Sequence, residues 1–205
     1  MPLARSCASS TLLFVVVSHW TVVGCAPRVA HAGFWFEDVS YESPGVGSLT
    51  PEDLETIGII ARAELIEAFS GLRFALSQRR DATYRVRVVQ QLLDNRFRRH
   101  VEVAGHSLGI TGLGGQGAVS MSFLASSAVA YAPADVTRAE LIEAIGRGVG
   151  RAAVHEFTHQ LLPRASIHST NIHSYEYTSA ARPEQYFGDM HWDLALPLLR
   201  QRFGG

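Results

Sequence analysis

The chain has no lysine, only two cysteines and almost no net charge. Its 18 basic residues are therefore all arginine, and its 19 acidic residues balance them to a net charge of −1. Such a balance gives no electrostatic reason to expect nucleic acid or an acidic membrane surface as a partner. Both cysteines, Cys7 and Cys25, lie near the N-terminus. Once an export signal is removed, the mature chain keeps at most one cysteine and forms no internal disulfide.

The composition also argues against a disordered chain. Hydrophobic residues make up 47% of the 205 residues and charged residues 18%, which is typical of a globular protein. A chain of this length can bury a sizeable core as one domain. We therefore predict a single domain over residues 50–205, preceded by a leading segment at residues 25–49.

The first 24 residues resemble an export signal. Arg5 gives a basic start, and the apolar run over residues 12–23 is too short for a permanent membrane span. The sequence Val22-Val23-Gly24-Cys25 resembles a bacterial lipobox, which predicts cleavage before Cys25 and a lipid on its sulfur. The alternative is cleavage after Ala32, as in ordinary secretion. We expect a cell-envelope lipoprotein, or else a secreted or periplasmic protein, with membrane attachment only through that lipid.

Two long helices are predicted. Thr50 can cap a helix that begins at Pro51, and an apolar stripe with three- and four-residue spacing runs from there to Leu76. The second helix starts with a capping box at Thr137. Pro163 is expected to end it, since proline cannot continue a helix.

Alternating polar and apolar residues predict three strands between these helices, with a glycine-rich connection before the last one. The strands are expected at residues 83–89, 100–104 and 118–124, and the connection at residues 105–117. After the second helix the chain is expected to be irregular until a short helix at residues 192–202. The predicted class is α+β: a small mixed β-sheet packed on two long helices, with an irregular C-terminal lobe that ends in a helix.

The second helix carries the sequence His155-Glu156-Phe157-Thr158-His159. Histidines four residues apart on a helix project from the same face, so they can bind one metal ion. Glu156 is then close to the metal and free to hold a water molecule. Ala152 and Gly148 lie on the same face, and their small size is expected to leave room for metal and substrate. The pattern predicts a zinc site, as opposed to two surface histidines beside a solvated glutamate.

A catalytic zinc needs a third protein ligand and an open fourth position. His168 is the predicted third ligand, because the chain can turn back toward the helix after Pro163. His173, Glu176 and His191 are the alternatives, and each could equally be a surface residue of a loop.

These residues make the sequence similar to the metzincin zinc endopeptidases, which have a zincin fold. The resemblance rests on the His-Glu-x-x-His motif, on His168-Ser169-Thr170-Asn171, and on Gly188-Asp189-Met190-His191-Trp192. Leu162 and Ala165 stand where the family has a glycine and the third histidine, so the third ligand here is reached through a connection three residues longer. By the resemblance, Met190 would lie in a turn beneath the metal.

The resemblance implies an enzyme that hydrolyses peptide bonds of a protein or peptide substrate. One zinc ion is held by His155, His159 and His168, and Glu156 activates the zinc-bound water as general base. A further donor would stabilise the negative charge that develops on the substrate. Tyr175, Tyr177 and Tyr186 are the candidates for that role.

Two other functions are compatible with the sequence. Gly105-His106-Ser107-Leu108-Gly109 matches the nucleophile motif of lipase-like and esterase-like serine hydrolases, with Asp135 or Asp189 and His191 as partners. The glycine-rich segment after Ser107 is a poor start for the helix that such a motif requires. The second alternative is a non-catalytic envelope lipoprotein, although a structural zinc site would have no need of Glu156.

Overall fold

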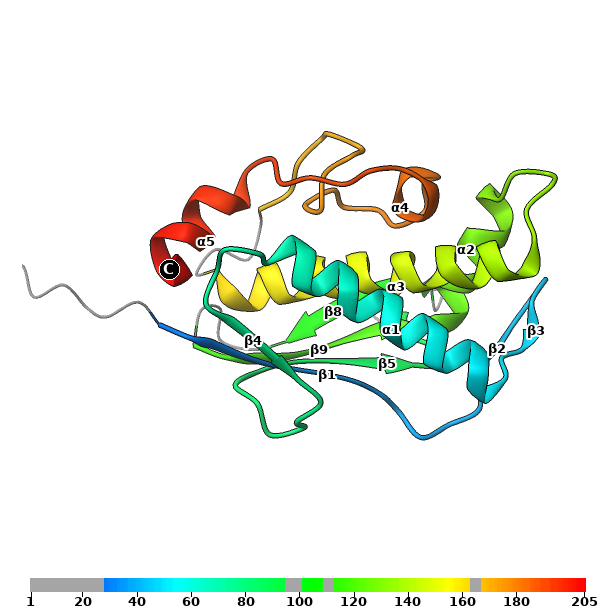
Figure 1. The fold of residues 1–205 in the computed structure, drawn as a ribbon, viewed down its shortest axis with the longest axis horizontal. Helices are drawn as coiled ribbons and strands as arrows, with labels where there is room; N and C mark the ends of the chain where they lie inside the picture. The colour runs from blue at the N-terminus through cyan, green and yellow to red at the C-terminus, as the bar shows by residue number, and fades with distance from the viewer. Residues whose placement is uncertain (1–27, 95–100, 109–112, 163–166) are drawn as a thin grey trace, which may run out of the picture.

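The structure is a computed structural model that describes residues 28–94, 101–108, 113–162 and 167–205. The predicted signal segment, Cys25 and Pro163 lie outside these residues. The described chain forms three layers (Figure 1): a β-sheet, two long helices on one face of it, and a C-terminal segment that crosses the helices on their other side. No helix in the described part is long and apolar enough to cross a membrane.

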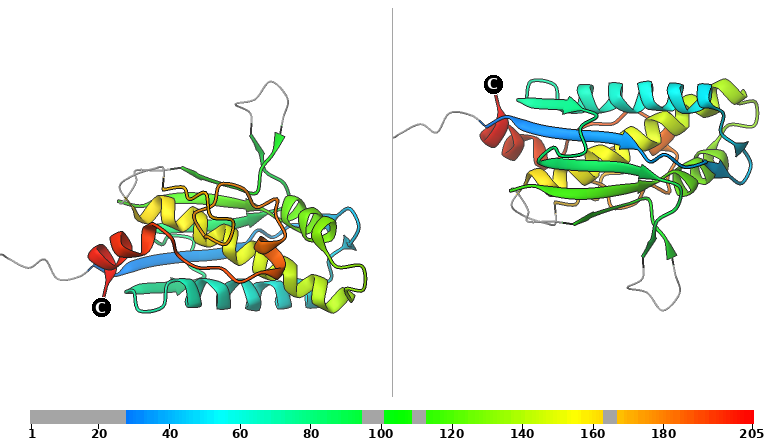
Figure 2. Two further views of the ribbon diagram at one scale, coloured as in Figure 1. Left: turned by 90° about the horizontal axis from the view of Figure 1, so that it is seen from above. Right: turned by 90° about the horizontal axis from the view of Figure 1, so that it is seen from below.

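The main sheet has five strands in the order β4-β1-β5-β9-β8. Strands β1 (Ala30–Phe36), β4 (Phe74–Ser77), β5 (Tyr84–Val89) and β9 (Gly115–Ser120) run parallel, while β8 (Gly105–Leu108) runs antiparallel to β9 at the edge. Two small hairpins, β2 (Glu42–Ser43) with β3 (Gly47–Ser48) and β6 (Leu93–Asp94) with β7 (Val101–Glu102), extend from this sheet. The β6–β7 hairpin projects from the body of the molecule (Figure 2). The sheet is thus mixed, as predicted, but mostly parallel.

The first predicted helix, α1 (Pro51–Ala68), is confirmed with its cap. The Thr50 hydroxyl accepts from the backbone N–H of Asp53, and the Asp53 carboxylate accepts from the backbone N–H of Thr50. The helix ends before Gly71, whose φ of 74° is left-handed, so the stripe does not continue to Leu76. Leu76 lies instead in β4, a strand that the sequence analysis did not predict.

The second predicted helix, α3 (Arg138–Leu161), is also confirmed, with the capping box at Thr137 and Glu140. It is buried along most of its length, because α1 packs beside it and the sheet lies below it. Glycines permit this approach: a Cβ on Gly150 would lie 2.8 Å from the backbone oxygen of Ala61 in α1. The core therefore lies between α3, α1 and the inner face of the sheet.

The prediction for residues 118–124 was partly wrong. The strand β9 ends at Ser120, and the helix α2 (Met121–Tyr131) begins there because the Ser120 side chain accepts from the backbone N–H of Phe123. The buried residues of α2 follow a three- and four-residue spacing that the strand pattern had obscured. The glycine-rich connection was also wrong in part, because its ends form β8 and the start of β9.

Residues 30–36 of the leading segment belong to the sheet. They form β1, which lies between β4 and β5, and Ala30, Ala32 and Phe34 are buried in the core. Cleavage after Ala32 would therefore cut inside a core strand, whereas cleavage before Cys25 would leave the strand intact.

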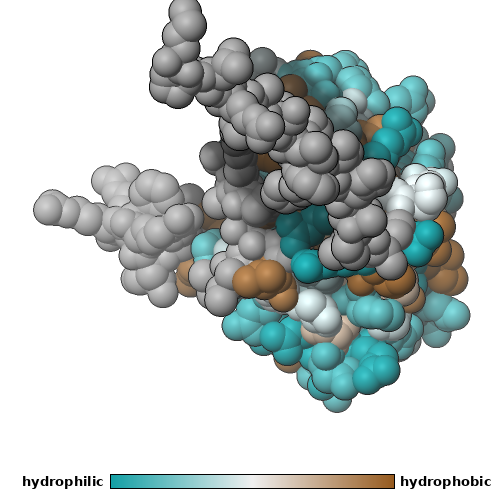
Figure 3. All heavy atoms as spheres, turned by 90° about the vertical axis from the view of Figure 1, so that its left-hand side faces the viewer, coloured by the Kyte–Doolittle hydropathy of each residue, from teal (hydrophilic) through white to brown (hydrophobic). Residues whose placement is uncertain are grey.

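The C-terminal segment is mostly irregular, as predicted. It contains the single-turn helix α4 (Glu184–Phe187) and ends in α5 (Ala195–Phe203), slightly later than expected. The Arg73 backbone N–H donates to the Phe203 backbone oxygen, which joins the end of the chain to the start of β4. On the face of the molecule seen in Figure 3, the described surface is mainly hydrophilic, with scattered hydrophobic patches.

Candidate metal centre

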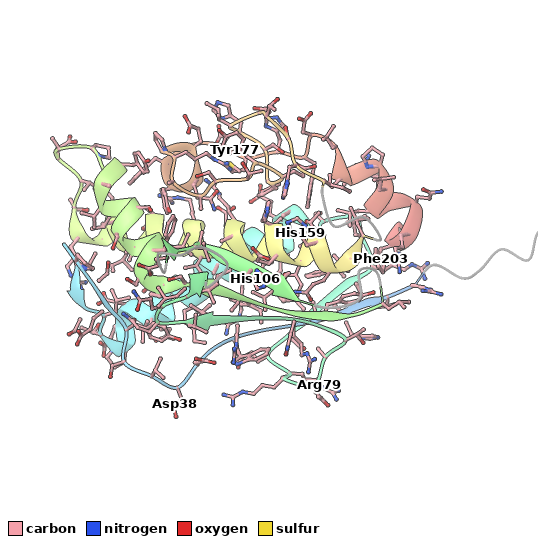
Figure 4. The ribbon with its side chains drawn as sticks, turned by 180° about the vertical axis from the view of Figure 1, so that it is seen from behind. Asp38, Arg79, His106, His159, Tyr177 and Phe203 are labelled. Carbon is pink, nitrogen blue, oxygen red and sulfur yellow. The ribbon has the colours of Figure 1, made fainter. Side chains whose placement is uncertain are left out.

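The structure brings His155, His159 and His168 together. His155 and His159 come from α3, and His168 comes from the segment that follows it. One ring nitrogen from each lies within 4.8 Å of the other two, and this is the one such group found among the described residues. His159 lies on the side of α3 that faces the C-terminal segment (Figure 4).

The geometry of the three rings fits a zinc ion. The Nε2 atom of His159 is 2.9 Å from that of His155 and 3.4 Å from that of His168. Three nitrogens bound tetrahedrally at about 2.0–2.1 Å would be separated by about 3.3 Å. The three nitrogens therefore lie close enough together to hold one ion.

The backbone orients the first of these rings. The His155 Nδ1 lies 2.9 Å from the Tyr175 carbonyl oxygen, so a proton on Nδ1 leaves Nε2 free to bind a metal. Burial, together with the neighbouring His159, lowers the pKa of His155 to about 3. The imidazole is thus neutral at physiological pH, which is the form that binds a metal.

The three residues considered as alternative third ligands make other contacts in the structure. The rings of His173 and His191 stack on one another at 6.4 Å, and the His191 Nε2 lies 3.0 Å from the Asn171 side-chain nitrogen. The Glu176 carboxylate accepts from the Ser174 hydroxyl and from three backbone N–H groups at the start of α5, those of residues 193, 194 and 195. The structure therefore places His168 beside the two helical histidines and gives Glu176 a structural role.

Glu156 lies next to the histidines and is 5% exposed. Its carboxylate rests against Gly105 of β8, where an added Cβ would lie 2.4 Å from Oε1. The structure gives this carboxylate no ion-pair partner among the described residues. Burial raises the pKa of Glu156 to about 7. A carboxylate with a pKa near neutrality can accept a proton and release it again at physiological pH.

A cavity of about 290 Å³ opens beside this centre. Ala152, His155 and Glu156 of α3 line it, together with the segment 102–105. Tyr175 and residues 177–180 of the C-terminal segment also line it. The site thus combines three convergent histidines, a buried glutamate of raised pKa and space for a ligand beside them.

Two buried arginines hold the C-terminal segment in place, and the sequence analysis missed both. Arg151 forms a bidentate pair with Glu64 of α1 at 3.0 and 3.1 Å and donates to the backbone oxygens of Glu184 and Gly188. Arg182 donates to the backbone oxygens of Ser174 and Ser179, which flank Tyr175. Arg151 could have been noticed as a charge one turn before His155, on the buried side of the helix.

The three tyrosines proposed as donors have different surroundings. Tyr186 is buried with its ring against Gly148, where a Cβ would lie 2.5 Å from Cε1. The small size of Gly148 therefore makes room for Tyr186 and not for substrate, which corrects the expectation; Ala152 does line the cavity. Tyr175 is also buried, against Trp192.

Tyr177 is the half-buried member of the three and lines the cavity. It lies on the C-terminal segment above α3 (Figure 4), and its ring covers the Arg182 guanidinium at 4.6 Å. Arg182 also approaches Met190, whose sulfur is 3.9 Å from its Nη2. Met190 therefore packs against the arginine that supports the site.

The serine of the rival motif is not arranged as a nucleophile. The Ser107 hydroxyl donates to the Glu156 backbone oxygen at 3.0 Å and lies 3.2 Å from the Gln160 amide nitrogen. Ser107 lies within the edge strand β8, and the described residues give it no histidine partner. Ser107 therefore joins β8 to α3.

The chain matches no known protein-family model, and a search of curated proteins finds no match. What can be said of its function consequently rests on the geometry of the site.

Proposed function

We propose that the protein is a zinc-dependent hydrolase and, more specifically, an endopeptidase with a zincin-like fold. The observation that carries the proposal is the convergence of three histidine nitrogens next to a buried glutamate whose pKa is raised to about 7. His155, His159 and His168 would hold the ion, and its fourth position would face the cavity. A bound zinc would supply a water of lowered pKa and polarise a carbonyl group.

The residues around the ion would have separate roles in the reaction. Glu156 accepts the proton of the attacking water and passes it to the leaving amine, for which its raised pKa is suited. Gly105 allows that carboxylate to lie against the edge strand. Tyr177 is the candidate for stabilising negative charge on the substrate, because it lines the cavity beside Glu156.

The edge strand β8 supports a peptide as substrate. Its partner β9 lies on one side of it, and the described part of the main sheet has no strand on the other. An extended peptide can add to such an edge through backbone hydrogen bonds, which bind any sequence. Because Gly105 of β8 also touches Glu156, a peptide bound there would pass close to the proposed general base.

The test is proteolysis of a casein-like substrate by the zinc-loaded protein. We expect a zinc chelator to abolish cleavage and Glu156→Gln to lower it by about 10²–10⁴-fold without loss of zinc. Ser107→Ala should leave most of the activity, because Ser107 serves as a structural hydrogen-bonding group. Zinc-dependent cleavage that survives Glu156→Gln would contradict the mechanism. Zinc binding with no hydrolysis of any peptide would instead favour the non-catalytic alternative.

A further inference from the structure

The cavity beside the metal centre contains one carboxylate that the proposed mechanism does not use. Glu102, at the end of β7, lines the cavity together with Glu156 and His155. The Glu102 Oε1 accepts from the Ser120 hydroxyl at 2.8 Å, and Ser120 is fully buried at the start of α2. The carboxylate is thus fixed at the cavity wall by one of its oxygens.

The charge of Glu102 is not cancelled by the arginines nearby. Arg151 also lines the cavity, but its side chain is only 7% exposed and its charge is neutralised by the bidentate pair with Glu64. Arg182 donates to the backbone oxygens of residues 174 and 179 and is covered by the Tyr177 ring. Among the described residues, Glu102 has no ion-pair partner. The Glu102 carboxylate therefore presents negative charge at the described wall of the cavity.

The walls of the cavity suit a long aliphatic stem. Phe123 and Val103 lie on one side and the ring of Tyr177 contributes to the cover. The volume of about 290 Å³ is near the lower end of the range for whole-ligand sites, about 300–1,000 Å³, so it fits one large side chain. Glu102, at the end of β7, precedes Gly105, at the start of β8, by three residues, so their backbones are at most about 10 Å apart. A long side chain can span that distance from a backbone held near Glu156.

We infer that this cavity binds an arginine or lysine side chain of the residue adjacent to the scissile bond, and that Glu102 determines this preference. The inference rests on the proposed peptidase function. The aliphatic stem of the substrate side chain packs between the rings and its cationic group pairs with the free oxygen of Glu102. A neutral side chain of similar length keeps the packing but leaves the carboxylate without a partner.

The test uses peptides that differ only at one position flanking the cleaved bond, with arginine, methionine or glutamate there. For the zinc-loaded protein we expect kcat/KM to be about 10- to 100-fold higher for the arginine peptide than for the methionine peptide. Glu102→Gln should reduce that ratio to less than about threefold, and Glu102→Lys should favour the glutamate peptide. Glu143→Gln removes an exposed carboxylate of α3 outside the cavity and should keep the wild-type ratio.

A second readout does not need turnover. Fluorescence anisotropy should show that zinc-loaded Glu156→Gln protein binds the arginine peptide more tightly than the methionine peptide, and that adding Glu102→Gln removes the difference. Equal binding of both peptides, or an arginine preference that survives Glu102→Gln, would overturn the inference. Chelator-sensitive proteolysis with no such preference would leave the proposed function standing. Arginine-selective binding without proteolysis would support the inferred binding of a cationic side chain in the cavity and contradict the proposed peptidase function.

Discussion

Two regions of the described chain combine a pair of histidines with a buried glutamate. In the first, His155 and His159 of α3 point their Nε2 atoms at one another beside Glu156. In the second, His173 and His191 stack near Glu176. Among the described residues the first glutamate has no ion-pair partner, and burial raises its pKa, whereas the second accepts hydrogen bonds from three backbone N–H groups.

The difference shows that a pair of histidines beside a buried glutamate is not enough to indicate a metal centre. The His191 Nε2 is engaged by the Asn171 side chain, so its ring helps to join two parts of the loop. The His155 Nδ1 is engaged by a backbone oxygen, which leaves the Nε2 free. A buried carboxylate that accepts several backbone hydrogen bonds stabilises the fold, whereas one that has a raised pKa and no ion-pair partner among the described residues is a candidate for chemistry.

Substituting the two glutamates should separate these roles, and this is the largest effect we expect. Glu156→Gln should abolish most proteolysis and leave the melting temperature nearly unchanged. Glu176→Gln should lower the free energy of unfolding by about 1–3 kcal/mol, because a buried amide nitrogen would face backbone donors at the start of α5. Thermal melts and activity assays of both variants provide the check. A large loss of stability in Glu156→Gln would contradict the assignment of a catalytic role to Glu156 and a structural role to Glu176.

Gly105→Ala should lower the proteolytic activity without changing any of the proposed metal ligands. The new Cβ would meet the Glu156 Oε1 at 2.4 Å, so the carboxylate must move. Since displacement of a catalytic group by about 1 Å can cost about 10²-fold, we expect a 10- to 100-fold loss of activity with zinc content unchanged. Gly205→Ala, where nothing lies within 4 Å, is the matched control. Full activity of Gly105→Ala would mean that Glu156 is not held as described.

Arg182→Met should weaken zinc binding from a distance. Arg182 holds the backbone on both sides of Tyr175, whose carbonyl oxygen orients His155. Loss of such indirect support typically costs about 10- to 100-fold in metal affinity, and we expect a change of about tenfold in zinc Kd. The control is Arg79→Met, which removes an exposed arginine paired only with Asp81. An unchanged zinc Kd in a folded Arg182→Met protein would show that the loop orients His155 without this arginine.

The smallest effect is expected at Asp53, remote from both regions. Hydrogen bonds from Arg138 lower the pKa of Asp53 to about 2, so its stabilising contribution is present above about pH 4 and is lost as the pH falls toward 2. Because Arg138 is half exposed, Asp53→Asn should cost only about 1 kcal/mol at neutral pH. Acid unfolding curves of wild type and variant should converge below about pH 2. A variant as stable as wild type at pH 7 would contradict this assignment.

The parts of the fold that follow from local sequence were predictable. Thr50 and Thr137 cap their helices through side-chain bonds to residues three positions on, which the sequence alone indicates. The strand β1 was not predictable, because its polar and apolar residues do not alternate. Its residues are buried because β4 and β5 pair with it on both sides. The helix α2 was missed because its apolar residues were compatible with both the two-residue period of a strand and the three- to four-residue period of a helix.

The same distinction between local and long-range contacts applies to the candidate site. The spacing of His155, Glu156 and His159 depends only on helical geometry, so the sequence could place them together. The position of His168 depends on how the segment after α3 folds back. Arg151 of α3 donates to backbone oxygens of that segment more than 30 residues away, and Arg182 donates to backbone oxygens within the segment. Such contacts leave no periodic signal.

The most direct test is the zinc content of the purified protein and of three single variants, measured by plasma mass spectrometry after dialysis. We predict about one zinc per chain for the wild type and for His173→Ala, since His173 belongs to the second region, and strong depletion for His168→Ala. His155→Ala should be depleted to the same degree as His168→Ala. Zinc retained by His168→Ala but lost from His173→Ala would contradict the assignment of the metal to the three converging histidines.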